Sequence, residues 1–324
     1  MLRVGLIGSG FMAQTHLDRY EAMDDVAITA VAAPSSADAF VAENELDAEA
    51  FTDAEALMDA DVDAVDVCSP TPTHRPLVEA AAARDLDVFC EKPIALTLAD
   101  ANAIADTAAD AGITLMVGHV LRFFEAYRAI HDAIADGAVG EPGTVRARRV
   151  SPFPDWADWY TDTRRSGGVF HDLVIHEFDF CRWAVDDVER VFARAHEGEG
   201  NHRGQATLRF ENGAVGYVEA GWDRPPGGDL TSEFEVAGDE GILEYDSTDG
   251  VPLAIETGED GEPLPPPVER DGYRRELDAF AEAVRRGEDP PVSVDDAIEA
   301  VRIALAARRS AERGEPVDVA EVVA

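Results

Sequence analysis

Short apolar runs alternate with stretches of helical periodicity over the first part of the chain. The runs have the length of single strands, and they lie at 2–7, 26–32, 64–68, 88–90 and 113–117. Helices are predicted between them, through residue 20, from residue 37, near 52–60, and over 76–84 and 97–111. Because strands that alternate with helices pair in parallel, this pattern predicts a doubly wound parallel sheet.

The pattern changes after Gly118-His119. A predicted helix over 124–135 is followed by strands that fit a mainly antiparallel sheet, at 144–150, 188–196, 205–210, 214–221, 233–236, 242–245 and 253–256. Asn212-Gly213 separates two of these strands and is a strong hairpin signal. A Gly-, Glu- and Pro-rich exposed loop is predicted at 258–267, followed by helices at 274–286 and 294–313. We therefore expect two domains, 1–120 and 121–324.

The composition is that of a large globular protein of the cytoplasm. The 324 residues are 46% hydrophobic, enough for two cores, and no apolar stretch is long enough to span a membrane. The chain opens directly on a strand-like run without the features of a signal peptide. Three cysteines, Cys68, Cys90 and Cys181, are an odd number in a long chain, which argues against a disulfide framework and for a reducing compartment.

Acidic residues outnumber basic ones by 66 to 27, for a formal net charge of −39. Such a surface repels nucleic acid and anionic membranes, so neither is an expected partner. The acidic residues are spread along the whole chain, which argues against a single acidic tail. An evenly acidic, almost lysine-free protein is typical of salt-loving organisms, where salt screens the repulsion between carboxylates.

A glycine-rich turn follows the first predicted strand. Gly8-Ser9-Gly10-Phe11-Met12-Ala13 has the form G-x-G-x-x-A and stands between a strand and a helix. The glycines permit a tight turn and close backbone approach, and the helix N-terminus offers free amides to a pyrophosphate. This context predicts a Rossmann-type dinucleotide-binding site.

The end of the second strand bears on which dinucleotide binds. An NAD site usually carries an acidic residue there, whereas this chain has Ala33-Pro34-Ser35-Ser36 and no carboxylate before Asp38. Two hydroxyls without an acid would tolerate a 2′-phosphate, which favours NADP over NAD, although an arginine for that phosphate is also missing. Alternatively, the serines cap the helix that begins at Ala37.

Glu91-Lys92-Pro93 contains the only lysine of the chain. Codon bias toward arginine, with one lysine left by chance, would explain a single lysine. A chemical explanation is also available, because burial and neighbouring groups can shift the pKa of an amine toward neutral pH, whereas that of a guanidinium cannot be shifted so far. Pro93 holds Lys92 in an extended, non-helical conformation. Glu91-Lys92 and Ser69-Pro70 each follow a strand, so both are expected at the carboxyl edge of the sheet, beside the cofactor.

A helix is predicted after Gly167-Gly168, continuing to Trp183. On such a helix Asp172 and His176 are four residues apart and share a face. His171 and His176 diverge, which argues against a two-histidine zinc pair, and no metal site is predicted. A structural alternative is that Asp172 only supports a surface histidine.

These motifs, in this order and spacing, resemble the Gfo/Idh/MocA oxidoreductase family over nearly the whole chain. The residues that carry the resemblance are Gly8-x-Gly10-x-x-Ala13, Ser69-Pro70-x-x-x-His74, Glu91-Lys92-Pro93, Gly118 to Arg122-Phe123, Gly167-Gly168, and Asp172-x-x-x-His176. The resemblance implies a Rossmann domain followed by an α/β domain with an open sheet that often forms an oligomer interface, here as a homodimer or homotetramer. It also implies NAD(P)-dependent chemistry at a hydroxyl or carbonyl of a sugar, inositol or related polyol.

The same resemblance implies a catalytic trio of Lys92, Asp172 and His176. Histidine has the intrinsic pKa to accept the hydroxyl proton, and an ammonium can stabilise charge on the substrate oxygen. Asp172 would orient the substrate or hold the imidazole or ammonium. The cofactor-binding residues predicted from all the motifs are Gly8, Gly10, Phe11, Met12, Ala13, Ser35, Ser36, Ser69, Pro70, His74, Glu91 and Lys92.

Substrate contacts are predicted less directly. Arg122 matches the family's substrate-side arginine, and the aromatic segment Trp156, Trp159 and Tyr160 with Arg164-Arg165 precedes the catalytic helix. Aromatic faces and planar donors suit a polyhydroxylated ring, although the aromatics would equally serve packing, and the arginines would also suit a sugar acid or nucleotide sugar. His171 departs from the family pattern, so it either lines the substrate pocket or caps the helix.

Two other functions compete with this one. A non-catalytic dinucleotide-binding sensor could use the same fold, but retention of Lys92, Asp172 and His176 argues against it. A metal-dependent lyase or hydrolase built on His171, Asp172, His176 and Glu177 is disfavoured by the divergence of the two histidines.

Overall fold

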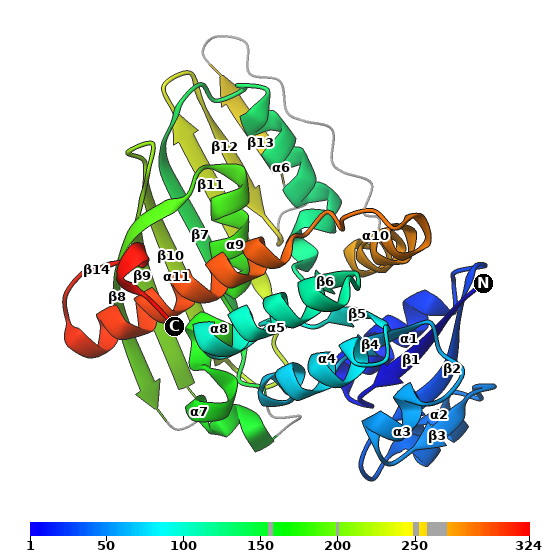
Figure 1. Ribbon diagram of the computed structural model, residues 1–324. Helices are drawn as coiled ribbons and strands as arrows, with labels where there is room; N and C mark the ends of the chain where they lie inside the picture. The colour runs from blue at the N-terminus through cyan, green and yellow to red at the C-terminus, as the bar shows by residue number, and fades with distance from the viewer. Residues whose placement is uncertain (155–157, 199–200, 249–252, 258–270) are drawn as a thin grey trace. The chain divides into compact units, whose positions relative to one another are not determined.

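The computed structural model describes residues 1–154, 158–198, 201–248, 253–257 and 271–324 (Figure 1). It divides into two compact units. The first comprises Met1–Val120 and Asp271–Ile298, and the second comprises Leu121–Arg270 and Glu299–Ala324. Residues 271–298 therefore pack with the first unit, whereas the sequence places them with the second. The predicted loop at 258–267 lies outside the described residues.

The first unit contains a six-stranded, fully parallel sheet in the order β3-β2-β1-β4-β5-β6. Its strands are β1 (Leu2–Ile7), β2 (Val26–Ala32), β3 (Glu49–Phe51), β4 (Ala64–Val67), β5 (Asp87–Cys90) and β6 (Leu115–Val117). The predicted parallel sheet is confirmed, with the short edge strand β3 added. Because the strand order reverses between β1 and β4, the carboxyl ends of these two strands mark the crevice where such sheets bind ligands.

The first unit also contains the following helices. They are α1 (Phe11–Tyr20), α2 (Ala37–Glu43), α3 (Ala54–Met58), α4 (His74–Ala82), α5 (Leu98–Ala111) and α10 (Gly272–Arg286). Asp53 and Thr97 accept hydrogen bonds from the backbone amides of Ala56 and Asp100, so their side chains cap α3 and α5. α10 packs on α1, where Arg19 donates to Asp271, and this contact joins residues 271–298 to the unit.

The second unit contains an eight-stranded sheet in the order β13-β12-β11-β7-β10-β9-β8-β14, mostly antiparallel. Its strands are β7 (Pro142–Pro152), β8 (Val188–Gly198), β9 (Asn201–Phe210), β10 (Val215–Arg224), β11 (Thr231–Gly238), β12 (Gly241–Asp246), β13 (Leu253–Thr257) and β14 (Val317–Asp318). Within this sheet, β7 and β10 are the one pair of neighbouring described strands that runs parallel. Asn212-Gly213 forms the predicted hairpin between β9 and β10, with Gly213 at a φ of 91°.

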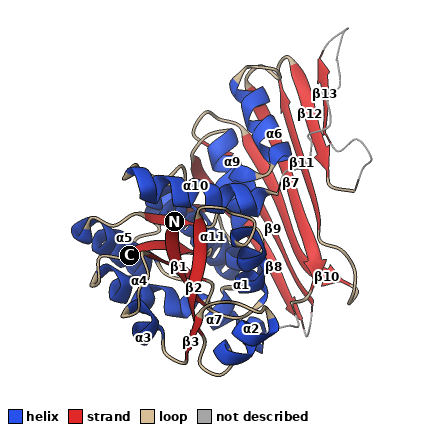
Figure 2. Ribbon diagram, turned by 90° about the vertical axis from the view of Figure 1, so that its right-hand side faces the viewer, coloured by secondary structure: helices blue, strands red, loops and turns tan. Residues whose placement is uncertain are grey.

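One face of this sheet is covered by helices (Figure 2). The helices of the unit include α6 (Glu125–Ala135), α8 (Gly168–Asp172), α9 (Ile175–Ala184) and the part of α11 (Val294–Arg313) from Glu299 on. In β9 every second residue is buried, which is the alternation expected of a half-covered sheet. A side chain at Gly204 would meet the Phe170 ring at 2.7 Å, so the glycine lets α8 pack directly on the strand.

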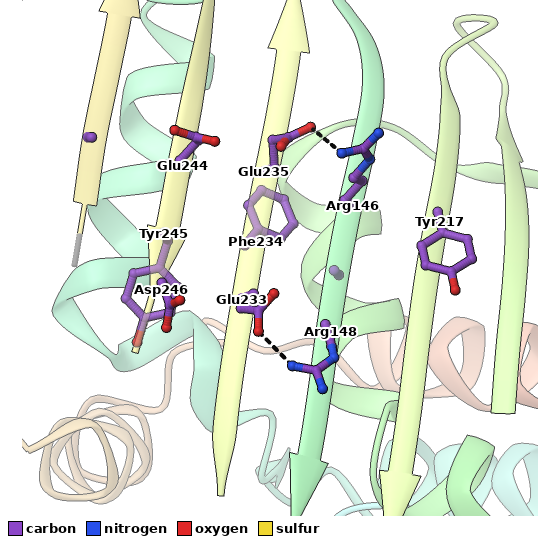
Figure 3. A pocket seen from close by; sticks show the side chains of 11 residues that line it. Arg146, Arg148, Tyr217, Glu233, Phe234, Glu235, Glu244, Tyr245 and Asp246 are labelled. Atoms are coloured by element: carbon purple, nitrogen blue, oxygen red, sulfur yellow. Dashed lines mark hydrogen bonds and ion pairs between the residues drawn. The ribbon is translucent and has the colours of Figure 1, made fainter. Parts of the chain in front are cut away.

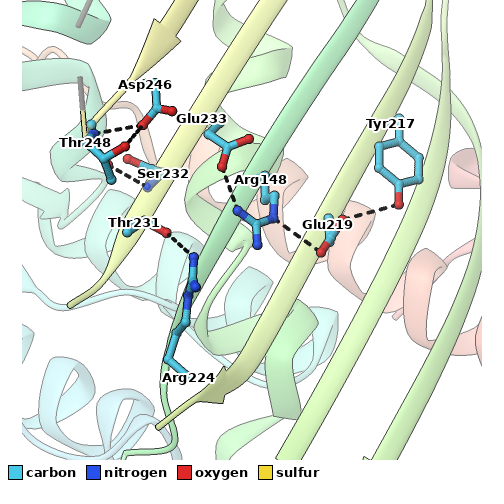
Figure 4. A network of polar contacts seen from close by, with 10 residues as sticks. Arg148, Tyr217, Glu219, Arg224, Thr231, Ser232, Glu233, Asp246 and Thr248 are labelled. Carbon is cyan, nitrogen blue, oxygen red and sulfur yellow. Dashed lines mark hydrogen bonds and ion pairs between the residues drawn. The ribbon is translucent and has the colours of Figure 1, made fainter. Parts of the chain in front are cut away.

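The opposite face carries a ladder of opposite charges (Figures 3 and 4). Arg148 of β7 lies between Glu233 of β11 and Glu219 of β10, at 2.6 and 3.3 Å. Arg146 pairs with Glu235 at 3.6 Å, and the strands here form a shallow hollow of about 370 Å³. These pairs neutralise part of the acidic surface, although each exposed pair stabilises the fold by only about 0–1 kcal/mol.

Candidate active site

The glycine-rich turn of the first unit has the geometry that the sequence predicts. Gly8 directly follows β1 with a φ of 127°, and a Cβ there would lie 2.6 Å from the carbonyl oxygen of Cys68. Only glycine therefore allows β1 and β4 to approach this closely. Gly10 caps α1 without crowding at its Cβ position, and the first turn of that helix holds no acidic residue. The free amides of α1 are thus open to an anionic group.

Ser36 contacts the glycine-rich turn rather than capping a helix. It occupies the residue before α2, but its side chain makes no capping hydrogen bond. Its hydroxyl instead lies 2.6 Å from the hydroxyl of Ser9, in the loop after β1. The capping alternative is therefore wrong for Ser36, and the hydroxyl joins the ends of β1 and β2.

His74 ties together two loops at the carboxyl edge of the sheet. The ring is buried, with Nε2 2.9 Å from the Ser69 carbonyl oxygen and Nδ1 3.0 Å from that of Pro93. Burial lowers the pKa of His74. His74 thus contacts both the Ser69-Pro70 loop and the Glu91-Lys92-Pro93 loop. Direct contact between His74 and a cofactor stays a prediction.

Lys92 lies half-buried between a cis peptide bond to Pro93 and the side chain of Glu91. The Lys92 backbone amide donates to Glu91 Oε2 at 3.1 Å. A side chain at Gly118 would meet Glu91 Oε1 at 3.3 Å, so the carboxylate is closely confined.

A buried polar cluster that the sequence analysis missed lies behind this loop. His16 of α1 is fully buried, with Nδ1 2.8 Å from Asp66 Oδ2 and 3.3 Å from Cys68 Sγ. Its Nε2 lies 3.2 Å from Glu91 Oε1. The available signal was Asp66, a charged residue inside the otherwise apolar strand β4, because a carboxylate is almost never fully buried without a partner.

His16, Asp66 and Cys68 each have one possible metal-ligand atom, and these atoms lie within 4.8 Å of one another, close enough to coordinate one metal ion. Burial raises the pKa of the Cys68 thiol, and thiols bind metals as thiolates. Since Cys68 is held as a thiol and the three groups already bond one another, we assign them to a hydrogen-bonded cluster.

In the second unit, the single helix predicted after Gly167-Gly168 is wrong. α8 ends at Asp172 and α9 begins at Ile175, so Asp172 and His176 lie on different helices. The amides of Leu173 and Val174 both donate to the Val169 carbonyl, which widens the turn. Consecutive β-branched residues, Val174 and Ile175, weaken the helix at this point. The shared-face argument for Asp172 and His176 therefore does not hold; both side chains are half-buried.

His171 is fully buried in the second unit. Burial lowers its pKa to about 3, with a further contribution from the Arg308 charge. Both alternatives for His171, lining the substrate pocket and capping the helix, stay predictions.

His171 should make folding sensitive to acid. Its pKa in the folded state is depressed, so between about pH 6.5 and 3 the unfolded chain binds a proton that the folded chain excludes, and stability falls as pH falls. Going from pH 7 to pH 4 should cost wild type roughly 3 kcal/mol more than His171→Leu. Denaturant unfolding at constant high salt measures this difference. His196→Leu, at an exposed histidine, is the control, and equal acid sensitivity in wild type and His171→Leu would contradict the prediction.

Two buried ion pairs anchor α9 beside His176. Arg122, predicted to contact substrate, binds Asp179 through Nε and Nη2 at 2.9 and 2.6 Å and lies over the Trp183 ring at 5.5 Å. Arg149 donates to Glu177 at 2.6 Å. Glu177, proposed by the metal-dependent alternative as a ligand, is thus bound to a guanidinium. Substrate contact by Arg122 stays a prediction.

The aromatic segment before α7 (Thr163–Ser166) packs on itself. Trp159 stacks on Tyr160 with ring centres 4.0 Å apart, and Tyr160 meets Trp222 edge-on at 5.9 Å. Arg164 pairs with Asp162 through two contacts of 2.9 Å while staying exposed. These contacts favour the packing alternative for Trp159. Trp156 lies outside the described residues.

Comparison with known proteins assigns both units. The model for an oxidoreductase family with an NAD-binding Rossmann fold, Gfo/Idh/MocA, matches residues 2–119, and the Gfo/Idh/MocA C-terminal domain matches residues 127–244. The chain belongs to the Gfo/Idh/MocA oxidoreductase family. The resemblance inferred from the sequence motifs is thereby confirmed.

Relatives within the Gfo/Idh/MocA family align along most of the chain. Myo-inositol 2-dehydrogenase of Thermotoga maritima is 33% identical over 99% of this chain and all of its own. D-xylose 1-dehydrogenase (NADP⁺) 2 of Haloferax volcanii is 30% identical over 81% of this chain and 82% of its own. The structure of levoglucosan dehydrogenase with NADH and levoglucosan has a TM-score of 0.87 and 25% identity, covering 98% of both chains.

The first unit of this Gfo/Idh/MocA protein fits a dinucleotide. The approach of Gly8 to β4, the uncrowded Gly10 and the start of α1 without acidic residues suit a pyrophosphate. Among the described residues, none of the helices combines the length and apolar character needed to cross a bilayer.

Proposed function

We propose that this family member transfers a hydride between the nicotinamide of NAD or NADP and a secondary hydroxyl or carbonyl of a sugar, inositol or related polyol. The observation that carries the proposal is that the glycine-rich turn and the Glu91-Lys92-Pro93 loop occupy one edge of a sheet in a chain whose two units both match the family. The names of the relatives, which are inositol and sugar dehydrogenases, support the substrate class.

Lys92, Asp172 and His176 are the proposed catalytic residues. The nicotinamide, when bound, accepts or donates the hydride. His176 takes the hydroxyl proton during oxidation and returns it during reduction. Lys92 donates a hydrogen bond to the substrate oxygen and stabilises the negative charge that develops on it. Asp172 orients the substrate or holds the imidazole or ammonium.

NADP is the proposed preference over NAD. The Ser9 and Ser36 hydroxyls, bonded to each other beside the pyrophosphate turn, supply donors without a carboxylate, and a 2′-phosphate is compatible with that chemistry. The relatives do not agree on the cofactor. The D-xylose dehydrogenase is named for NADP⁺, whereas the levoglucosan dehydrogenase was solved with NADH. The two cofactors are therefore compared directly in the experiment below.

The proposal extends to assembly and milieu. The outer face of the eight-stranded sheet carries the charge ladder together with exposed Phe192, Val215 and Tyr217, and we assign it as the interface of a homodimer or homotetramer. The acidic composition and three free cysteines support the cytoplasm of a salt-loving organism.

The test of function is cofactor reduction at high salt, followed by nicotinamide absorbance. NADP⁺ and NAD⁺ are each offered with neutral sugars, inositols, sugar acids and 1,5-anhydro sugars. We expect turnover with at least one polyol and a higher kcat/KM for NADP⁺. Dinucleotide binding without turnover in either direction would instead favour the sensor alternative.

A further inference from the structure

The buried cluster behind Lys92 forms a continuous chain of charged groups in the first unit. Asp66 lies 2.8 Å from Nδ1 of His16, and Glu91 lies 3.2 Å from Nε2 on the other side of the ring. Glu91 then accepts the Lys92 backbone amide through its second oxygen at 3.1 Å. The chain therefore runs from strand β4 through helix α1 to the loop after β5.

Charge balance within this cluster requires His16 to be an imidazolium. Both carboxylates are buried, and a buried carboxylate without a cationic partner is very costly. Burial alone disfavours the charged ring, but the Asp66 carboxylate outweighs it and raises the pKa of His16 well above its usual range. Although burial opposes ionisation of Glu91, its contact with His16 lowers the pKa of that carboxyl.

Other groups also act on the cluster, and the Lys92 charge contributes to the lowering of the Glu91 pKa. From α1, Tyr20 faces Asp66, and burial together with the Asp66 charge raises the pKa of its phenol. From α10, Tyr273 places its ring 6.4 Å from His16, and the buried Glu276 acts electrostatically on Tyr20. Phe89 of β5 meets the His16 ring edge-on at 5.4 Å, which fixes its plane. The imidazolium is thus held in one orientation with a carboxylate at each nitrogen.

The buried cluster also fixes the position of the Lys92 backbone. Glu91 is confined between His16 and Gly118, so its hydrogen bond to the Lys92 amide starts from a fixed carboxylate. On the far side, Nδ1 of the buried His74 ring lies 3.0 Å from the Pro93 carbonyl oxygen. A residue whose backbone is held at both neighbours presents its side chain within a narrow range of positions, and a misplacement of about 1 Å can cost about 100-fold in rate.

We propose that His16, bridging Asp66 and Glu91, is a positioning residue that holds Lys92 in place for hydride transfer; this inference rests on the proposed function. Neither His16 nor Asp66 contacts the reacting atoms in this scheme. They act through Glu91 and the loop, so their loss lowers kcat while dinucleotide binding and the KM for polyol change little.

The test compares His16→Gln and Asp66→Asn with wild type, using the polyol and cofactor found above. His16→Gln should lower kcat by about 10 to 100-fold at every pH, with dinucleotide Kd and polyol KM within about threefold. Asp66→Asn removes one charge but keeps the ring, so its kcat relative to that of wild type at the same pH should rise on acidification toward pH 6 as His16 becomes protonated. A purely structural role would not produce this acid rescue. Gln14→Ala on the same helix, outside the cluster, is the control.

A second measurement does not depend on turnover. Histidine-selective ¹⁵N NMR of the wild type should show one imidazole that stays charged above pH 8, and that signal should be missing in His16→Gln. A neutral His16 at pH 8, or unchanged kcat in both variants, overturns the inference while leaving the proposed function intact. Failure of the wild type to turn over any polyol in either direction overturns the proposed function, and the inference with it. Thermal melts of both variants show whether a loss of kcat is caused by unfolding.

Discussion

Lys92→Arg should lower kcat by at least about 100 to 1,000-fold while leaving dinucleotide binding within about threefold. Arginine keeps the positive charge, but its longer, planar guanidinium places its donors differently and does not release a proton near neutral pH. The Lys92 backbone is held by Glu91 on one side, so the loop has little freedom to accommodate the larger group. Stopped-flow or steady-state absorbance gives kcat, and calorimetry gives the dinucleotide Kd.

The matched control is Arg75→Lys on the surface of α4, where the side chain pairs with Glu79 and Asp100. This variant should keep wild-type kcat, showing that exchange between arginine and lysine is harmless elsewhere. Near wild-type turnover by Lys92→Arg would contradict the catalytic role of the only lysine. A parallel loss of dinucleotide binding would instead indicate damage to the cofactor edge of the sheet.

Asp179→Ala should destabilise the second unit by roughly 3–5 kcal/mol. The substitution removes the carboxylate from a buried, bidentate pair and leaves the Arg122 guanidinium without its main counter-charge. The cost is that of a buried cation that has lost its bidentate carboxylate partner, and salt screens a buried charge much less than a surface charge. Denaturant unfolding followed by tryptophan fluorescence at fixed high salt measures it.

Two further variants make this prediction specific. The double variant Arg122→Met with Asp179→Leu replaces both charges with apolar groups and should recover most of the lost stability. Asp162→Asn removes the partner of the exposed Arg164 and should cost less than about 1 kcal/mol. If Asp179→Ala unfolded as easily as Asp162→Asn, the pair with Arg122 would not be the anchor of α9.

Local patterns were sufficient for most of the fold. The apolar runs that became β1, β2, β4, β5 and β6 are mostly buried, so their composition alone identified them. Gly8 and Asn212-Gly213 were found because a turn with positive φ demands particular residues. β3 was missed because three residues are too few to show a period.

Local sequence patterns could not predict the packing between segments that are distant in the chain. The break between α8 and α9 has only a weak local signal in Val174-Ile175, and it changes where Asp172 and His176 lie. Arg122 matched a substrate-binding pattern, yet Asp179, 57 residues away, takes up its guanidinium. The assignment of residues 271–298 to the first unit rests on contacts between α1 and α10, which are far apart in the chain.

The sequence by itself determined the parallel and mainly antiparallel sheets, the dinucleotide turn, the singular Lys92 and the family, since each rests on residues close together or on motif order. Only the tertiary structure decided that His16 lies between Asp66 and Glu91 behind Lys92, and that buried arginines hold α9. A charged side chain in the sequence shows that a partner is needed. Which partner it finds depends on how strands and helices distant in the chain are brought together, because burial, distance and orientation set the energy of an ion pair.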